Sequence, residues 1–236
     1  ITGKCTPTPR RRRPRLAIAA PALIALPLLP AYDMTDADLA RSLGQRLHGD
    51  RTGACIAAAV IDNNKVSRAY VCADPDSKPR IGPTDGFEIG SVSKTMTATL
   101  LAEMIDQGKA SLDDPLADWL PKGTRVPQWK GQPIRLRDVV THSSGLPALP
   151  PGVAITNPSD PYADMQPEQV IDALGKVTLK GAPGTQPQYS NFAMMLLSWG
   201  IAHRSNTDLD TLLRQKLFRP LGMHGAWVHK RPEGLQ

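Results

Sequence analysis

The sequence of 236 residues lacks several patterns that define large classes of protein. No stretch reaches the roughly 18 uninterrupted apolar residues that a membrane-spanning helix needs, so no stable membrane span is predicted. No Gly-x-Ser-x-Gly sequence occurs, which argues against an α/β-hydrolase, and no glycine-rich phosphate loop is present. With 41% hydrophobic and 21% charged residues, the composition is that of a globular protein of one domain or two subdomains.

Acidic residues are absent from residues 1–31, although this segment holds six basic residues. These six account for the whole formal net charge of +6, because the rest of the chain has 22 basic and 22 acidic residues. The remaining chain is therefore formally neutral. A basic face that binds nucleic acid is not predicted for it.

The same N-terminal segment has the layout of a secretory signal peptide. A cluster of arginines precedes the apolar residues 16–31, and the small residue Ala31 ends the stretch. We therefore predict a signal peptide over residues 1–31 and an exported, periplasmic protein. Because the chain begins with Ile1 rather than Met, the alternative is a start at Met34, which would make the protein cytosolic.

A β-hairpin is predicted shortly after this segment. Residues 54–62 and 65–73 are strand-like, and Asn63-Asn64 between them can adopt the positive φ of a two-residue turn. No other segment indicates a strand as clearly, and an isolated hairpin is marginal in water. The hairpin therefore either lies alone on a helical body or belongs to a sheet completed by sequence outside this chain.

Cysteines are scarce: the chain has three, and Cys5 lies within the predicted signal peptide. In the register set by the two-residue turn, Cys55 faces Cys72 at a non-hydrogen-bonded pair, where Cα atoms are closest. We therefore predict a Cys55–Cys72 disulfide, which fits an oxidising compartment. The alternative is a pair of small buried hydrophobic residues.

Most of the remaining chain is predicted to be helical. Helices are expected over residues 36–48, behind Thr35 as N-cap, and over 91–107, 135–142, 167–174, 191–203 and 208–217. Thr207 is the expected N-cap of the last of these. The connection from Gly145 to Met165 contains five prolines and is long enough to border a functional site.

The sharpest chemical pattern is Ser91-Val92-Ser93-Lys94, at the start of a predicted helix. A Ser-x-x-Lys spacing on a helix lets the hydroxyl and the amine project from one face. A neutral Lys94 can take the proton of the Ser91 hydroxyl, and the N–H groups of the first turn can face an oxyanion. Because this spacing also arises by chance, the alternative is that Ser91 caps the helix and Lys94 is solvated.

A second pattern, Tyr189-Ser190-Asn191, precedes another apolar helix. A phenol and an amide two residues apart on a loop can point into one cavity. Tyr189 can then relay a proton between Ser91 and a leaving amine, while Asn191 can bind a substrate amide. The alternative is an Asn N-cap beside a packed tyrosine.

Five phrases occur in order: FEIGSVSK, GKASLDDPLADWLP, IRLRDVVTHSSGLP, PGTQPQYSN and LFRPLGM. From about residue 54 to residue 228, this series closely resembles the serine β-lactamase class C and penicillin-binding-protein family, whose acyl transfer uses a Ser-x-x-Lys motif. The resemblance implies that Ser91 is the acylated nucleophile and Lys94 its activating amine. It also implies that Tyr189 is the catalytic base or proton shuttle and Asn191 a contact for the substrate amide.

The resemblance also implies an architecture. The expected fold is α/β and β-lactamase/transpeptidase-like, a sheet domain plus a helical domain. Residues 32–90 would supply the helix and hairpin of the sheet domain, and residues 91–236 would form the mainly helical domain. The family's third motif, Lys or His followed by a small residue and Gly, is not found, so residues 32–236 are expected to be the N-terminal part of a C-terminally truncated domain.

The resulting functional prediction is a serine acyl-transfer hydrolase that acts on D-Ala-D-Ala peptides of peptidoglycan through an acyl-enzyme. The phrases GTRVPQWKGQPIRL and LKGAPGTQPQYSN most resemble the D-alanyl-D-alanine carboxypeptidase/endopeptidase branch. The alternatives are a class C-type β-lactamase or an esterase of the same fold, with a β-lactam as a possible substrate. A further alternative is a truncated, non-catalytic remnant that lacks the third motif.

Other candidate residues are expected to be structural. His142, in Thr-His-Ser-Ser-Gly, suggests a Ser/His pair, but the corresponding stretch in the family is the end of a structural helix. Asp113 and Asp114 indicate a turn that opens a short helix. His224 and His229 have no companion ligand, so neither a metal nor an organic cofactor is predicted.

Overall fold

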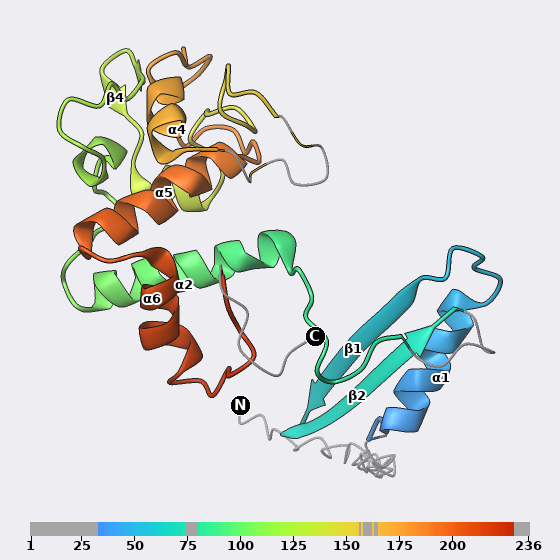
Figure 1. The fold of residues 1–236 in the computed structure, drawn as a ribbon. Helices are drawn as coiled ribbons and strands as arrows, with labels where there is room; N and C mark the ends of the chain where they lie inside the picture. The colour runs from blue at the N-terminus through green and yellow to red at the C-terminus, as the bar shows by residue number, and fades with distance from the viewer. Residues whose placement is uncertain (1–32, 74–79, 156, 158–161, 163–164, 229–236) are drawn as a thin grey trace, which may run out of the picture. The chain divides into compact units, whose positions relative to one another are not determined.

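The structure is a computed structural model that describes residues 33–73, 80–155, 157, 162 and 165–228 (Figure 1). The chain divides into two compact units, Ile1–Gly82 and Pro83–Gln236. The predicted signal peptide over residues 1–31 lies outside the described residues. Among the helices that are described, none combines the length and apolar character needed to cross a membrane.

In the first unit, helix α1 (Asp36–Leu47) packs against a two-stranded hairpin. Thr35 caps the helix as predicted: its side chain accepts the N–H of Asp38, and the Asp38 carboxylate accepts the N–H of Thr35 in return. Such a reciprocal capping box satisfies backbone donors that the helix itself cannot pair. Leu39 and Leu43, at helical spacing, then pack with Ala69 of the hairpin, and Leu47 is also buried.

The hairpin consists of β1 (Cys55–Asp62) and β2 (Lys65–Cys72), paired antiparallel in the predicted register. Asn63 and Asn64 have φ values of 47° and 63°, as the two-residue turn requires. The N–H of Ala73 donates to the carbonyl of Ala54 at 2.8 Å, which leaves the adjacent pair of cysteines without ladder hydrogen bonds. The structure joins that pair, Cys55 and Cys72, by a disulfide.

The second unit is mainly helical. Its elements are η1 (Gly90–Val92), α2 (Ser93–Asp106), η2 (Leu116–Trp119), α3 (Leu136–Val140), α4 (Pro167–Leu174), α5 (Asn191–Arg204), α6 (Leu209–Leu213) and the π-helical turn η3 (Arg214–Phe218). Each predicted helical segment after residue 90 corresponds to one or two of these elements.

The last helical segment differs from the prediction at its beginning. The N-cap is Asp208 rather than Thr207. One oxygen of the Asp208 carboxylate accepts the N–H of Thr211 at 2.8 Å, and the other accepts the Thr211 hydroxyl at 2.7 Å. A carboxylate has two oxygens for these donors, whereas the single threonine hydroxyl has one, so the aspartate displaces its neighbour as the cap.

Two short strands were not predicted. β3 (Gln128–Trp129) and β4 (Gln132–Pro133) form a small antiparallel ladder. The turn between them has positive φ at Lys130 and Gly131, 48° and 83°. Strands of two residues are too short to show the alternation of apolar and polar residues by which strands are detected in a sequence.

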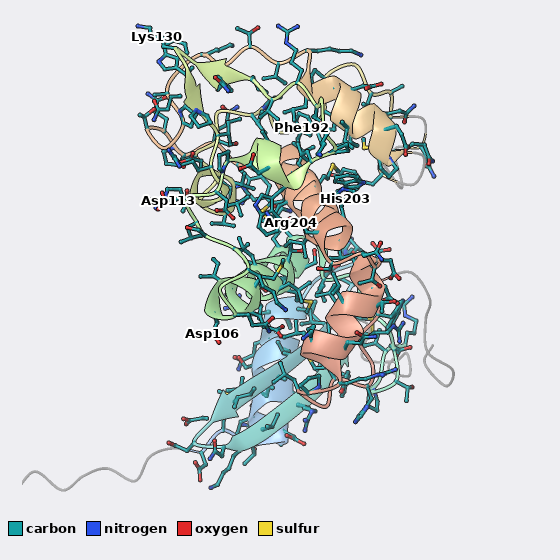
Figure 2. All side chains as sticks on the ribbon, turned by 90° about the vertical axis from the view of Figure 1, so that its left-hand side faces the viewer. Asp106, Asp113, Lys130, Phe192, His203 and Arg204 are labelled. Atoms are coloured by element: carbon teal, nitrogen blue, oxygen red, sulfur yellow. A yellow bond between two sulfur atoms is a disulfide. The ribbon has the colours of Figure 1, made fainter. Side chains whose placement is uncertain are left out.

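Helices α2 and α5 pack together and begin at the same end of the pair (Figure 1). Phe192 lies at the first turn of α5, while His203 and Arg204 lie at its other end (Figure 2). Gly200 of α5 allows a close approach to η2, because a Cβ at this position would lie 2.9 Å from the carbonyl oxygen of Trp119. The core around the two helices includes Leu100, Leu101, Trp119, Phe192, Leu196, Leu197 and Ile201.

Candidate active site

Ser91 and Lys94 lie at the beginning of α2. Gly90, the first residue of the 3₁₀ turn η1, has a φ of 51°, which glycine adopts without strain, and this turn runs directly into the helix. The Nζ of Lys94 donates a hydrogen bond to the Oγ of Ser91 at 3.0 Å. Ser91 does not cap α2, whose N-cap makes no side-chain hydrogen bond, so the capping alternative is wrong.

Tyr189, immediately before α5, contacts the same serine. Its hydroxyl donates to the Oγ of Ser91 at 2.5 Å, and the Nζ of Lys94 lies 5.0 Å from the centroid of its ring. The packing of α2 against α5 thus brings together side chains that are 98 residues apart in the sequence. Tyr189 is about half exposed, at 49%, so a substrate can reach the residue.

The electrostatics of this cluster favour the ionised form of the phenol. The nearby Lys94 amine, and after it the hydrogen bond shared with Ser91, lower the pKa of Tyr189 below its ordinary value. A phenol with a lowered pKa loses its proton at a pH closer to neutrality. It is therefore better suited to exchange a proton with a hydroxyl at hydrogen-bonding distance.

Asn191 is the first residue of α5, but it does not cap that helix. Ser190 is the N-cap: its Oγ accepts the N–H of Ala193 at 3.0 Å and donates to the carbonyl of Pro147 at 2.6 Å. The amide of Asn191 instead donates to the hydroxyl of Tyr162 at 3.1 Å. Sequence reasoning did not single out Tyr162, although it lies in the loop predicted to border a site.

A cavity of about 580 Å³ adjoins these groups. Ser91, Lys94 and Asn191 line one part of it. Much of the rest is apolar and comes from α4, α5 and α6; this part includes Val170, Met194, Met195 and Leu213. The arrangement therefore places a hydroxyl, an amine and an amide at one hollow that is large enough for a small substrate.

His142, expected to be structural, lies against the candidate site. Its ring centroid is 4.4 Å from that of Tyr189, and its Nδ1 accepts the N–H of Ser190 at 3.2 Å. Burial, and to a smaller degree the charge of Lys94, lower the pKa of the imidazole. The histidine does not pair with the serines of its own segment, since Ser143 contacts the hydroxyl of Thr141 and Ser144 binds backbone.

The two neighbouring aspartates have structural contacts. Asp113 forms an ion pair with Arg137 at 2.5 Å (Asp113 is labelled in Figure 2). Asp114 accepts the N–H of Ser111 at 3.1 Å and the indole N–H of Trp119 at 3.3 Å. Across the described part of the chain, no group of three His, Cys, Asp or Glu side chains is arranged to hold a metal ion; His229 lies outside that part.

Comparison with known proteins gives the following similarities. Residues 39–235 match the β-lactamase family. The D-alanyl-D-alanine-carboxypeptidase/endopeptidase AmpH of Escherichia coli (strain K12) is 38% identical over 179 residues, which are 75% of this chain and 46% of that protein. The chain therefore spans about half the length of the curated relatives that it matches.

Two solved structures are similar over most of the chain. The β-lactamase/D-alanine carboxypeptidase from Yersinia pestis, complexed with citrate, has a TM-score of 0.72 and 29% identity, covering 84% of this chain and 56% of that one. A class C β-lactamase has a TM-score of 0.65 and 25% identity, covering 84% of this chain and 52% of the other. Both likenesses agree with the α/β architecture expected from the sequence.

Proposed function

The chain belongs to the β-lactamase family, and on that basis we propose that it is part of a serine acyl-transfer hydrolase whose nucleophile is Ser91. One observation carries the proposal: Lys94 Nζ and Tyr189 OH converge on the Oγ of Ser91, at 3.0 Å and 2.5 Å. A hydroxyl with two proton-exchanging groups at hydrogen-bonding distance is the arrangement of an activated nucleophile.

In the proposed acylation, Tyr189 acts as a phenolate that accepts the proton of Ser91, while the Lys94 ammonium stabilises its negative charge. The Oγ of Ser91 attacks the carbonyl carbon of the scissile amide, and the carbonyl oxygen becomes an oxyanion. The backbone N–H of Ser91, in the first helical turn, is a candidate donor to it. When the C–N bond breaks, Tyr189 returns the proton to the leaving amine, so that an acyl-enzyme and a free amine result.

Deacylation uses the same groups in the opposite sense. Tyr189 takes a proton from a water molecule, whose oxygen attacks the ester carbonyl of the acyl-enzyme. The bond to Oγ then breaks, and the proton goes from Tyr189 to Ser91. The carboxylic acid product leaves, and the three side chains regain the arrangement in which they started. No metal or organic cofactor takes part in either step.

The proposed substrates are D-Ala-D-Ala peptides of peptidoglycan. This choice is supported by the identity of 38% to a D-alanyl-D-alanine-carboxypeptidase/endopeptidase. The side-chain amide of Asn191, at the rim of the cavity that Ser91 also lines, is the proposed contact for the substrate amide. An exported, periplasmic location is part of the proposal, supported by the signal-peptide pattern of residues 1–31 and by the disulfide of the hairpin.

A class C-type β-lactamase is the second candidate, supported by the similarity to a solved class C β-lactamase. An esterase of the same fold would use the same three side chains. These enzymes differ mainly in how fast water hydrolyses the acyl-enzyme. Steady-state turnover of a cephalosporin, a D-Ala-D-Ala peptide and a simple ester by the full-length protein separates the three.

Labelling with a fluorescent penicillin tests the nucleophile. We expect the full-length protein to be labelled covalently and the Ser91→Ala variant to remain unlabelled. Ser93→Ala is the matched control, because Ser93 lies in the same motif but its hydroxyl binds the backbone carbonyl of Gly90. Equal labelling of wild type and Ser91→Ala would refute the assignment, and a folded wild type that neither labels nor hydrolyses would favour a non-catalytic remnant.

A further inference from the structure

His142 holds the chain on both sides of Tyr189. Its ring Nδ1 accepts the N–H of Ser190 at 3.2 Å, and its backbone carbonyl accepts the N–H of Gln188 at 2.6 Å. The two residues that flank the tyrosine are thus bound to the two acceptors of a single residue. Rotation or displacement of the backbone at Tyr189 would break one or both of these hydrogen bonds.

The ring of His142 also limits the position of the Tyr189 side chain. The two ring centroids are 4.4 Å apart, with an angle of 34° between the planes. Lys94 lies 5.0 Å from the centroid of the same phenol ring, and the phenol hydroxyl reaches Ser91. The phenol is therefore held by its backbone, by the imidazole and by its contacts with α2.

The backbone conformation of His142 is unusual and follows from the end of α3. Its φ is +55°, in the left-handed region that residues other than glycine seldom adopt, although histidine is found there more often than most. The N–H of His142 donates to the carbonyl of Val139 at 3.1 Å, and the N–H of Ser143 donates to that of Asp138 at 2.8 Å. These bonds end helix α3 and fix the backbone of His142, the residue that carries both acceptors.

We propose that His142 is a positioning residue that fixes the Tyr189 phenol against Ser91 through its ring Nδ1 and its own carbonyl oxygen. The inference rests on the proposed role of Tyr189 in proton transfer. His142 acts through Tyr189 and the two residues that flank it, and it transfers no proton in the proposed reaction. Its contribution is to keep the phenol oxygen at the 2.5 Å separation from Oγ that proton transfer needs.

This role requires a neutral imidazole. Nδ1 accepts the N–H of Ser190 only when it carries no proton, which places the proton of the neutral ring on Nε2. Among the described residues, the titratable groups that face the ring are Lys94 on α2 and Tyr189 before α5. Burial and the charge of Lys94 lower the pKa of His142, so the neutral form persists to a lower pH than in a free histidine.

Two substitutions at position 142 test the side-chain acceptor separately from the backbone conformation. His142→Asn keeps an acceptor oxygen at the same number of bonds from the backbone as Nδ1, and asparagine tolerates positive φ. His142→Gly also tolerates positive φ but has no side-chain acceptor and no ring. Thermal melts of both variants in the full-length protein show that each is folded before its activity is compared.

The measured quantity is the rate constant for acylation by a fluorescent penicillin, as a function of pH. We expect His142→Gly to acylate roughly tenfold to a hundredfold more slowly, with little change in the concentration of penicillin at half-saturation, because misplacement of a reacting group slows the chemical step. His142→Asn should stay within a few-fold of wild type at neutral pH. It should also lose the decline in rate that protonation of His142 causes in wild type at acidic pH.

A second readout does not depend on activity. The ¹³C chemical shift of the Tyr189 Cζ, followed by NMR, reports the surroundings of the phenol in the unreacted protein. We expect this shift to change in His142→Gly and to stay near the wild-type value in His142→Asn. If wild type fails to acylate while the shifts behave as expected, the proposed function fails and the positioning role stands.

Two outcomes overturn the inference while leaving the proposed function intact. The first is a folded His142→Gly variant that acylates at the wild-type rate with the wild-type pH profile. The second is a His142→Asn variant that is as slow as His142→Gly, because the acceptor would then have no effect.

Discussion

Replacement of Tyr189 by phenylalanine removes a single oxygen atom, the one that lies 2.5 Å from the Oγ of Ser91. Two magnitudes distinguish what that oxygen does. If Tyr189 only holds the serine in place while Lys94 accepts the proton, the loss is that of one hydrogen bond, about 1 kcal/mol, or less than about tenfold in rate. If Tyr189 is the general base, the loss is roughly a hundredfold to ten-thousandfold, or about 3 to 5 kcal/mol.

We expect the larger loss. Lys94 and Ser91 lower the pKa of Tyr189. The residue is about half exposed, so the substitution should remove the base without leaving a cavity in the core. The assay is the rate of acylation of the full-length protein by a fluorescent penicillin at saturating concentration. Tyr70→Phe, on strand β2 of the other unit, is the matched control and should acylate at the wild-type rate.

The reasoning is refuted if Tyr189→Phe acylates within about tenfold of wild type. Such a result would leave Lys94 as the base, since it is the other group described at hydrogen-bonding distance from the Oγ of Ser91. A thermal melt shows whether the variant is folded. Loss of folded protein would reduce the labelled fraction but would not change the rate constant.

Three further predictions follow from individual contacts. Lys94→Ala removes the larger cause of the lowered pKa of Tyr189, so the pH at which the phenol ionises should rise toward its ordinary value in a spectrophotometric titration; an unchanged titration would contradict the assigned cause. Gly200→Ala places a Cβ 2.9 Å from the carbonyl oxygen of Trp119 and should destabilise the folded protein by about 1 to 3 kcal/mol in a denaturant titration; wild-type stability would show that α5 can move away at no cost. Reduction of the disulfide, whose cysteines are 17 residues apart, should lower stability by about 3 kcal/mol in melts with and without reductant, and identical melts would contradict this.

The parts of the fold that were predicted from the sequence depend on local rules. The asparagine pair sets the turn of the hairpin, the turn sets the register, and the register places Cys55 opposite Cys72. The spacing of Ser91 and Lys94 likewise determines that both project from one helical face. Each of these arrangements follows from residues close together along the chain or from a pairing that a short turn fixes.

The remaining parts depend on contacts that no local pattern encodes. His142 meets Ser190 across 48 residues, and a histidine in a loop gives no sign of which backbone N–H it will accept. Tyr162 likewise meets Asn191 across 29 residues, and no pattern in the sequence pairs the two. The N-cap at Asp208 was missed for a simpler reason, since two adjacent residues of capping type compete and the geometry of the turn selects one.

The fully buried Ser190 restricts how a mutant library for this protein should be built. Its neighbour Asn191 lines the cavity and its neighbour Tyr189 contacts Ser91, whereas its own hydroxyl both donates to Pro147 and accepts from Ala193. Random variation of the three positions together would discard most clones at the middle one, where threonine is the closest replacement able to do both. Libraries aimed at new amide substrates should therefore keep residue 190 constant and diversify position 191.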